Sequence, residues 1–207
     1  MIRGINSCGI ATDEAPAAAE EEPRPSTPAT PIILRQPTGN DGAALHRLVA
    51  ACPPLDPNSL YCNLLQCTHF ASTGIAAERA GELVGFISGY IPPAQPDTLF
   101  VWQVAVAAST RGEGLAKRML RELLQRPATA GVRYLETTIT PGNAASWALF
   151  ESLARDLQAP AERQLHFERA RHFGGAHDDE LLMRIGPFKS PLADDTQAPE
   201  ARGSPLT

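Results

Sequence analysis

The sequence predicts an α/β fold in which a mixed central sheet carries helices on both of its faces. Strand-like runs alternate with helical patterns along the second half of the chain. Before them, the strand-like runs TGIAAE and ELVGFISGYI meet at RAGE, which is typical of the tight turn of an antiparallel hairpin. The strongest helical pattern, RGEGLAKRMLRELLQR, has the apolar face expected of a helix on a sheet: Leu115, Met119, Leu120, Leu123 and Leu124.

The elements are expected in the order strand, two helices, three strands, helix, strand, helix and strand, with room for one more strand at AERQLHFE. The strands are expected within residues 32–37, 73–78, 82–91, 97–106, 132–140 and 179–188, and the helices within 38–52, 56–70, 111–126 and 143–157. Asp56 and Pro57 are expected to begin the second helix, and Asn143 to lie near the start of the last one.

Composition predicts a single folded domain at residues 31–188. We expect a disordered N-terminal tail at residues 1–30 and a disordered C-terminal tail at residues 189–207. Both are rich in Pro, Ala and acidic residues and poor in large apolar side chains. Such segments cannot bury enough apolar surface to offset the entropy of ordering the chain.

Charge and composition exclude several classes of function. The net charge of −5 argues against binding nucleic acid, which selects basic surfaces. No run reaches the roughly 18 apolar residues of a membrane span, and the N-terminus lacks the apolar stretch of a signal peptide. We therefore expect a cytoplasmic protein. The cysteines form no C-x-x-C pair and no metal site is expected; they are Cys8, Cys52, Cys62 and Cys67.

The stretch VAVAASTRGEGLAKRML predicts a strand, a glycine-rich turn and a helix. The first turn of a helix carries unpaired N–H groups and the positive end of the helix dipole. Gly112 and Gly114 leave room for a ligand there, and Arg111 adds a cation. The turn therefore predicts a phosphate or pyrophosphate site. It is neither a P-loop, because Arg118 stands where Ser or Thr is needed, nor a dinucleotide fingerprint, because Lys117 replaces the third Gly or Ala.

A third pattern, R/Q-x-x-G-x-G/A, matches Arg111, Gly114 and Ala116. Downstream, TTITPGNAASWALF fits a strand followed by N-x-x-[AS]-x-x-[LF]-[YF], through Asn143, Ser146, Leu149 and Phe150. With both elements, and a strand ending in Val-Ala-Val, residues 32–188 resemble the GNAT acetyltransferases. The resemblance implies the GNAT acyl-CoA N-acyltransferase fold and acetyl-CoA as co-substrate. The residues it implies for acetyl-CoA are Val104, Val106, Arg111, Gly112, Gly114, Ala116, Asn143 and Phe150.

Longer stretches resemble one branch of these enzymes: LDPNSLYCNLLQCTHF, GELVGFISGY, PDTLFVWQVAV, RYLETTITPGNAAS and HDDELLMRIGPF. They are similar to the diaminobutyrate acetyltransferases of ectoine biosynthesis. The resemblance implies transfer of acetyl to the 4-amino group of L-2,4-diaminobutyrate, giving N4-acetyl-L-2,4-diaminobutyrate, the precursor of a compatible solute. It also implies a homodimer.

A small zwitterion with an extra ammonium group requires acids and acceptors for two nitrogens and a donor for one carboxylate. The candidate substrate residues are Asp56, Trp102, Glu136, Thr137 and His177. Each has a structural alternative: Asp56 as a helix N-cap, Trp102 as a core aromatic and His177 as a solvated loop residue. A carboxylate such as Glu136 in an apolar strand must be paired, exposed or functional. Trp102 can face an ammonium through its ring.

For the chemistry, Glu136 is the expected general base, acting directly or through a water. The backbone N–H of Val104 is the expected oxyanion donor. Phe150 stands where many GNAT enzymes have a tyrosine that protonates the departing thiolate, so we expect no side chain to be indispensable as that acid. Two alternatives remain at this point: a GNAT enzyme for another small amine, and a sensor that binds acyl-CoA without turnover.

Overall fold

The structure is a computed structural model that describes residues 30–189. The tails predicted at 1–30 and 189–207 lie outside this range, apart from residues 30 and 189. Cys8 therefore also lies outside it. Within it, a seven-stranded sheet has the order β1-β2-β3-β4-β5-β7-β6. The strands are β1 Ile33–Arg35, β2 Ile75–Arg79, β3 Glu82–Tyr90, β4 Thr98–Val106, β5 Tyr134–Ile139, β6 Ala161–Phe167 and β7 Glu180–Ile185.

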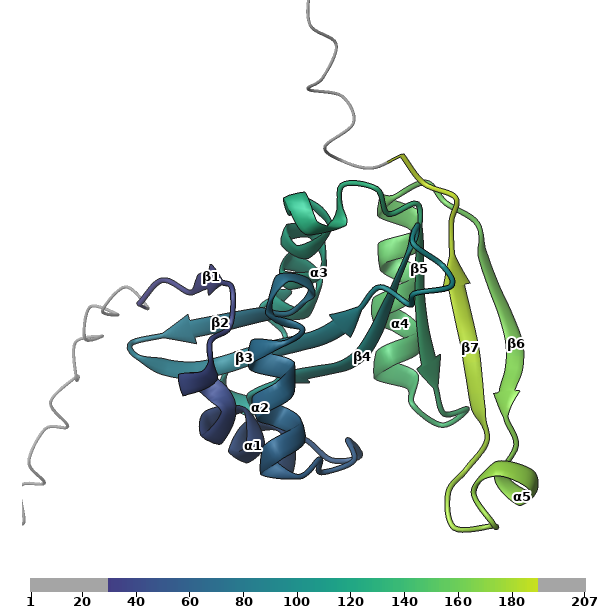
Figure 1. Cartoon of the computed structure of the whole chain (residues 1–207), viewed down its shortest axis with the longest axis horizontal. Helices are drawn as coiled ribbons and strands as arrows, with labels where there is room; N and C mark the ends of the chain where they lie inside the picture. Colours follow the sequence, from purple (N-terminus) through teal and green to yellow (C-terminus); the bar gives the residue numbers. More distant parts are fainter. Residues whose placement is uncertain (1–29, 190–207) are drawn as a thin grey trace, which may run out of the picture.

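The sheet is mixed, as predicted: β4 and β5 pair in parallel and every other neighbouring pair is antiparallel. The parallel pair needs a crossover, and α3 supplies it. The run AERQLHFE is β6, at the edge of the sheet. Figure 1 shows β6 and β7 as a long hairpin that ends in α5, well away from the N-terminal strands.

Helices cover both faces of the sheet, as predicted. The α-helices are α1 Gly42–Ala50, α2 Leu60–Thr68, α3 Leu115–Leu124, α4 Ala144–Asp156 and α5 Arg169–His172, and the 3₁₀ turns are Gly39–Asp41, Ala71–Thr73, Ala108–Thr110 and Pro127–Thr129. One apolar cluster joins α3 and α4 to the sheet, and a smaller one joins α1 and α2 to β2, β3 and β4. The five residues predicted as the apolar face of α3 are all buried to 2% exposure or less, which corresponds to about 1.5–3 kcal/mol of transfer free energy for each large side chain.

A β-bulge in β4 shapes the middle of the sheet. Ser88 of β3 pairs with Gln103 and the next residue, Gly89, pairs with Val101, so Trp102 is one extra residue without a partner. The close approach at the bulge requires glycine at position 89, because a Cβ there would lie 2.8 Å from the carbonyl oxygen of Phe100. β4 pairs with β5 only from Thr98 to Phe100. Beyond Phe100, the carboxyl-terminal parts of the two parallel strands do not pair with each other.

The start of α2 differs from the prediction. The helix begins at Leu60, and Ser59 is its N-cap, because the Ser59 hydroxyl accepts a hydrogen bond from the Cys62 N–H at 3.1 Å. Asp56 and Pro57 therefore lie in the preceding loop, and the expectation that they begin the helix is wrong. Freed from a capping role, the Asp56 side chain is 79% exposed at the mouth of a cavity.

Candidate functional site

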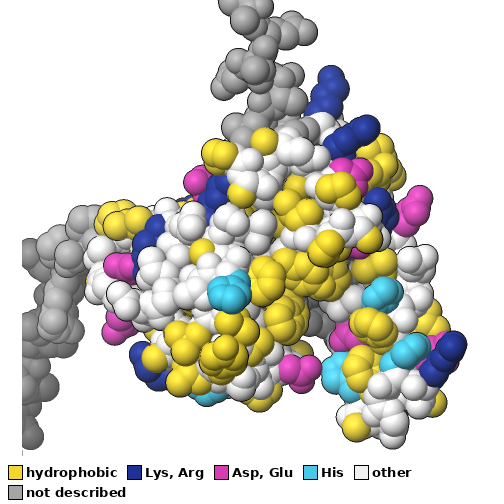
Figure 2. Space-filling model, in the orientation of Figure 1, with side chains coloured by type: hydrophobic (Ala, Val, Ile, Leu, Met, Phe, Trp, Pro, Cys, Tyr) yellow, Lys and Arg dark blue, Asp and Glu magenta, His cyan; other side chains and the backbone are white. Residues whose placement is uncertain are grey.

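A cavity of about 670 Å³ lies where β4 and β5 separate. Its walls are the carboxyl ends of these two strands, the loop of residues 54–58, the start of α4 and the tip of the β6–β7 hairpin. Figure 2 shows the molecule hollowed between its main body and this hairpin, with histidines on the hairpin side. The site is therefore built from segments that are far apart in the sequence.

The glycine-rich turn precedes α3 as predicted. Gly112 has a φ of 82° and Gly114, the N-cap of the helix, a φ of 72°. Both values lie in the left-handed region, which glycine adopts without steric cost. A Cβ at either position would meet nothing within 4 Å, so the surface beside the turn is open. The N-cap has no side chain that could accept from the first-turn N–H groups of α3, which leaves them available to an anion.

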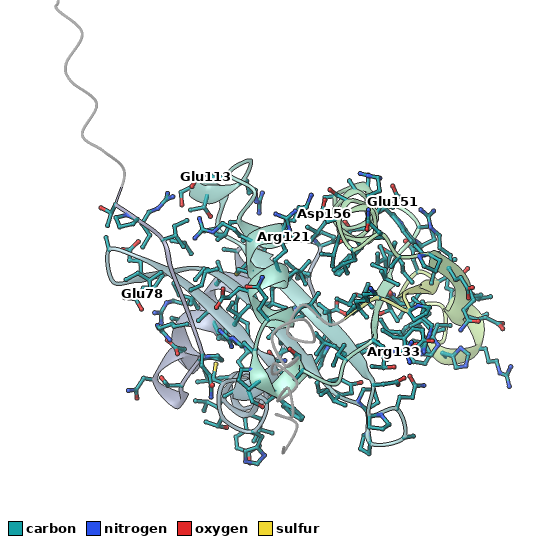
Figure 3. All side chains as sticks on the ribbon, turned by 90° about the horizontal axis from the view of Figure 1, so that it is seen from above. Glu78, Glu113, Arg121, Arg133, Glu151 and Asp156 are labelled. Carbon is teal, nitrogen blue, oxygen red and sulfur yellow. The ribbon has the colours of Figure 1, made fainter. Side chains whose placement is uncertain are left out.

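The charged side chains around this turn hold α3 in place. Arg111 donates from Nε to the carbonyl oxygen of Val106 at 3.4 Å, while Glu113 turns away to pair with Arg79. Lys117 and Arg121 both contact Asp156 of α4 at 2.6 Å. Figure 3 shows Arg121 and Asp156 next to each other, with Glu113 at the opposite end of α3. Ion pairs this open to solvent add little stability, so their main effect is to orient the helix.

The backbone of β4 presents hydrogen-bonding groups to the cavity. The Ala107 N–H donates to the Val84 carbonyl at 2.9 Å, so in an antiparallel ladder the backbone groups of Ala105 also face β3. The backbone groups of Val104 and Val106 therefore point away from β3, into the space between β4 and β5 where these two strands no longer pair. The Val106 carbonyl accordingly accepts from groups outside the sheet, namely Arg111 and the Cys52 thiol.

At the hairpin side of the cavity, a histidine lies between two carboxylates. His177 Nε2 is 3.9 Å from Asp56 Oδ2 and 3.8 Å from Glu180 Oε1. His177 Nδ1 is 2.8 Å from the carbonyl oxygen of Asp178. Because a carbonyl can only accept, Nδ1 carries a proton, and Nε2 is the nitrogen that faces the two carboxylates. Asp56 comes from the 54–58 loop, His177 from the segment that precedes β7, and Glu180 is the first residue of β7.

Glu180 is the residue that the sequence interpretation missed. Its side chain is only 16% exposed, and its Oε2 atom has no hydrogen-bond partner in the described structure. Burial is the largest influence on this carboxyl and raises its pKa above the ordinary value. The available signal was the position of Glu180 three residues after His177. It was hidden in the acidic run HDDE, where Asp178 and Asp179 are surface charges that contact Arg169.

Glu136 and Trp102 border a second, smaller cavity of about 410 Å³. Glu136 is 7% exposed and forms an ion pair with Arg184 of β7, whose guanidinium stacks on Tyr134 at 3.9 Å. Trp102 is 44% exposed and lines both cavities, so it is not a core aromatic. Glu136 lines the smaller cavity only, and the structure does not bring it beside His177.

Of the remaining predicted site residues, Thr137, Asn143 and Phe150 line the larger cavity, and Ala116 lies outside its lining. Thr137 of β5 is buried in its wall. Asn143 is the N-cap of α4 and accepts from the Ser146 N–H at 3.1 Å. Phe150, about two turns further into the same helix, is buried and lines the same wall. Ala116 lies in the first turn of α3.

Among residues 30–189, no helix is long and apolar enough to cross a membrane. Within the same range, no group of three or more His, Cys, Asp or Glu side chains could hold a metal ion. The features described for the site are the backbone groups of β4, the N-terminus of α3 and the cluster of Asp56, His177 and Glu180.

Comparison with known proteins identifies the family. The model of the acetyltransferase (GNAT) family matches residues 43–154. The L-2,4-diaminobutyric acid acetyltransferase of Methylotuvimicrobium alcaliphilum is 55% identical over 167 residues, covering 80% of this chain and 97% of that protein. The enzyme of the same name from Halomonas elongata is 48% identical over 163 residues, covering 78% of this chain and 84% of that protein.

A solved structure agrees with these relatives. The diaminobutyrate acetyltransferase EctA of Paenibacillus lautus, in complex with its substrate L-2,4-diaminobutyric acid and coenzyme A, is 42% identical and superposes with a TM-score of 0.74, covering 77% of this chain and 96% of that one. The chain belongs to the GNAT family of acetyltransferases, and the predicted fold is confirmed. Within that family it belongs to the L-2,4-diaminobutyric acid acetyltransferases.

Proposed function

We propose that this enzyme transfers the acetyl group of acetyl-CoA to the 4-amino group of L-2,4-diaminobutyrate, giving N4-acetyl-L-2,4-diaminobutyrate for ectoine biosynthesis. One observation carries the proposal: a single cavity is lined both by Val104 of β4, whose backbone groups face away from β3, and by the cluster of Asp56, His177 and Glu180. The first feature suits a thioester co-substrate, and the second suits a small amine. The names of the relatives and of the solved complex support the same substrate pair.

Acetyl-CoA is proposed to lie along the open side of β4. Its pyrophosphate would contact the N–H groups of the turn at Gly112 and Gly114 and the start of α3 at Ala116, with Arg111 supplying a cation. Its pantetheine arm would pair with the backbone groups of Val104 and Val106, in the position of a missing strand. The residues proposed for the opposite wall are Asn143 and Phe150 of α4.

The amino acid is proposed to bind at the other end of the cavity. The Asp56 carboxylate can pair with an ammonium group, and His177, when protonated on Nε2, can donate to the substrate carboxylate. The exposed ring of Trp102 can face the second ammonium. Thr137 adds a hydroxyl in the wall. Glu136 contributes a carboxylate, but one whose charge Arg184 already balances.

The chemistry needs a base, because an alkylamine with a pKa of about 10 is protonated at neutral pH. Glu136 is the candidate from the sequence, but its carboxylate is engaged by Arg184 and it does not line the larger cavity. We therefore propose Glu180, whose buried carboxylate has an unpartnered oxygen and a raised pKa, acting directly or through a water. The deprotonated nitrogen attacks the acetyl carbon, and the Val104 N–H stabilises the oxyanion. The C–S bond then breaks as the nitrogen loses its extra proton to solvent, which leaves the neutral amide, and solvent protonates the thiolate because Phe150 cannot.

The substrate assignment is tested by thiol release from acetyl-CoA with L-2,4-diaminobutyrate, L-ornithine and putrescine as competing acceptors, and by NMR of the product. We expect diaminobutyrate to have the highest kcat/KM, with acetylation at the 4-nitrogen, since the relatives and the solved complex carry the name of this substrate. A preference for another amine would contradict the substrate, and CoA binding without thiol release from any of the three would contradict the enzymatic function.

Glu180→Gln should lower kcat by at least about 100-fold, the usual loss for a general base. The base works deprotonated, so wild-type kcat/KM should rise as pH increases through the Glu180 pKa. This acidic limb lies above the ordinary glutamate value of about 4.3 because burial raises the pKa. The limb should vanish in Glu180→Gln and persist in the matched variant Glu136→Gln. Loss of the limb in Glu136→Gln alone would restore Glu136 as the base.

We further propose a cytoplasmic homodimer that does not bind nucleic acid. β6 is an edge strand whose seven residues are all exposed, including Leu165 at 52%. Such an edge favours pairing with another chain. Antiparallel pairing of two β6 strands about Gln164 would place Glu162 opposite His166 of the second copy. Light scattering should give twice the monomer mass, and Leu165→Lys should halve it; a monomeric wild-type protein would contradict the proposal.

A further inference from the structure

Gln103 connects the two substrate-facing parts of the site. It follows the bulge residue Trp102 on β4, and its side chain is buried to 8% exposure under the loop of residues 54–58. Its Nε2 donates to the carbonyl oxygen of Asp56 at 2.9 Å. Its Oε1 accepts from Asn58 Nδ2 at 2.7 Å. One carboxamide therefore ties both ends of a three-residue loop segment to the strand.

The orientation of this carboxamide is fixed by its partners. A backbone carbonyl can only accept, so the amide nitrogen of Gln103 must face Asp56, and its oxygen is then left for Asn58. Both short bonds are made in a region with little solvent, where losing one leaves a buried polar group unsatisfied. Among the hydrogen bonds of the described residues, these two are the ones that join residues 56–58 to β4.

We propose that Gln103 is a positioning residue for substrate binding. It acts through Asp56: the two hydrogen bonds set where the loop, and with it the Asp56 carboxylate, stands relative to Trp102 and His177. The Asp56 side chain is 79% exposed, so packing does not hold it in place. Its position is limited instead by the two hydrogen bonds of Gln103 to residues 56–58, which we call the clamp. This inference rests on the proposed function, because it assumes that Asp56 binds the amino-acid substrate.

Loss of the Gln103 hydrogen bonds should affect the binding of the two substrates differently. The glycine-rich turn and the open backbone of β4 are not part of the clamp, so releasing the loop should leave CoA binding intact. Diaminobutyrate is the ligand that meets Asp56. Displacing a binding group by about 1 Å can cost up to about 100-fold in rate or affinity, so the loss should be concentrated in the KM for the amine.

The test is Gln103→Met, which keeps the length of the side chain and removes both hydrogen bonds. We expect the KM for diaminobutyrate to rise at least about tenfold, with kcat and the Kd for CoA changed less than about threefold. The matched control is Gln66→Met in α2, since Gln66 is also a buried glutamine but bonds only within its own helix, to the Cys62 thiol. This control should keep both KM values near those of the wild type. Asn58→Ala, which removes one of the two bonds, should raise the same KM by less.

A cycle with Asp56→Asn shows whether Gln103 acts through Asp56, because this change keeps the backbone carbonyl that Gln103 binds. In the Asp56→Asn background, Gln103→Met should raise KM less than about twofold. An undiminished effect in that background, or an unchanged KM in the single variant, would overturn the proposal. Wild-type enzyme without activity on diaminobutyrate would instead contradict the proposed function, so the two failures are distinguishable.

Discussion

The site depends on one local irregularity, the extra residue that β4 carries at Trp102. A regular antiparallel ladder would keep β4 flat against β3 and let it pair with β5 along its full length. The bulge instead ends the parallel pairing at Phe100 and lets the carboxyl ends of β4 and β5 separate. It turns the backbone groups of Val104 and Val106 toward an open space and brings an aromatic ring to its rim. The cavity follows from how the chain is paired, before any catalytic side chain is considered.

The polar groups around that gap are of two kinds, and they lie at opposite ends of the site. At one end, a helix N-terminus and a left-handed glycine turn offer N–H groups to an anion, with charged side chains engaged elsewhere or at the margin. At the other end, two carboxylates and a histidine lie together, where we propose that the cationic amine binds. The burial that makes Glu180 a better base also disfavours its charged form. An incoming ammonium group offsets that cost, so substrate binding and the ionisation of Glu180 favour each other.

Much of this arrangement could be predicted from the sequence. Gly112, Gly114 and Asn143 are local signals, because their roles follow from turn and helix-capping rules that act within a few residues. Thr137 and Trp102 also lie where expected. The rest depends on contacts between distant segments. Arg184 neutralises Glu136 from 48 residues away, and Gln103 holds a loop 45 residues before it, and no local pattern reveals either. The start of α2 was misplaced because Ser59 competes with Asp56 as N-cap, and Glu180 was hidden among neighbouring acids.

The central claim is that acetyl-CoA takes the place of a missing strand beside β4. It is tested most directly by following the backbone amide signals of Val104, Ala105 and Val106 by NMR as acetyl-CoA is added. The account predicts downfield proton shifts at Val104 or Val106 on binding, as new hydrogen bonds form, and little change at Ala105, which already faces β3. Saturable binding that leaves both Val104 and Val106 unmoved would show that the co-substrate lies elsewhere and would contradict the account.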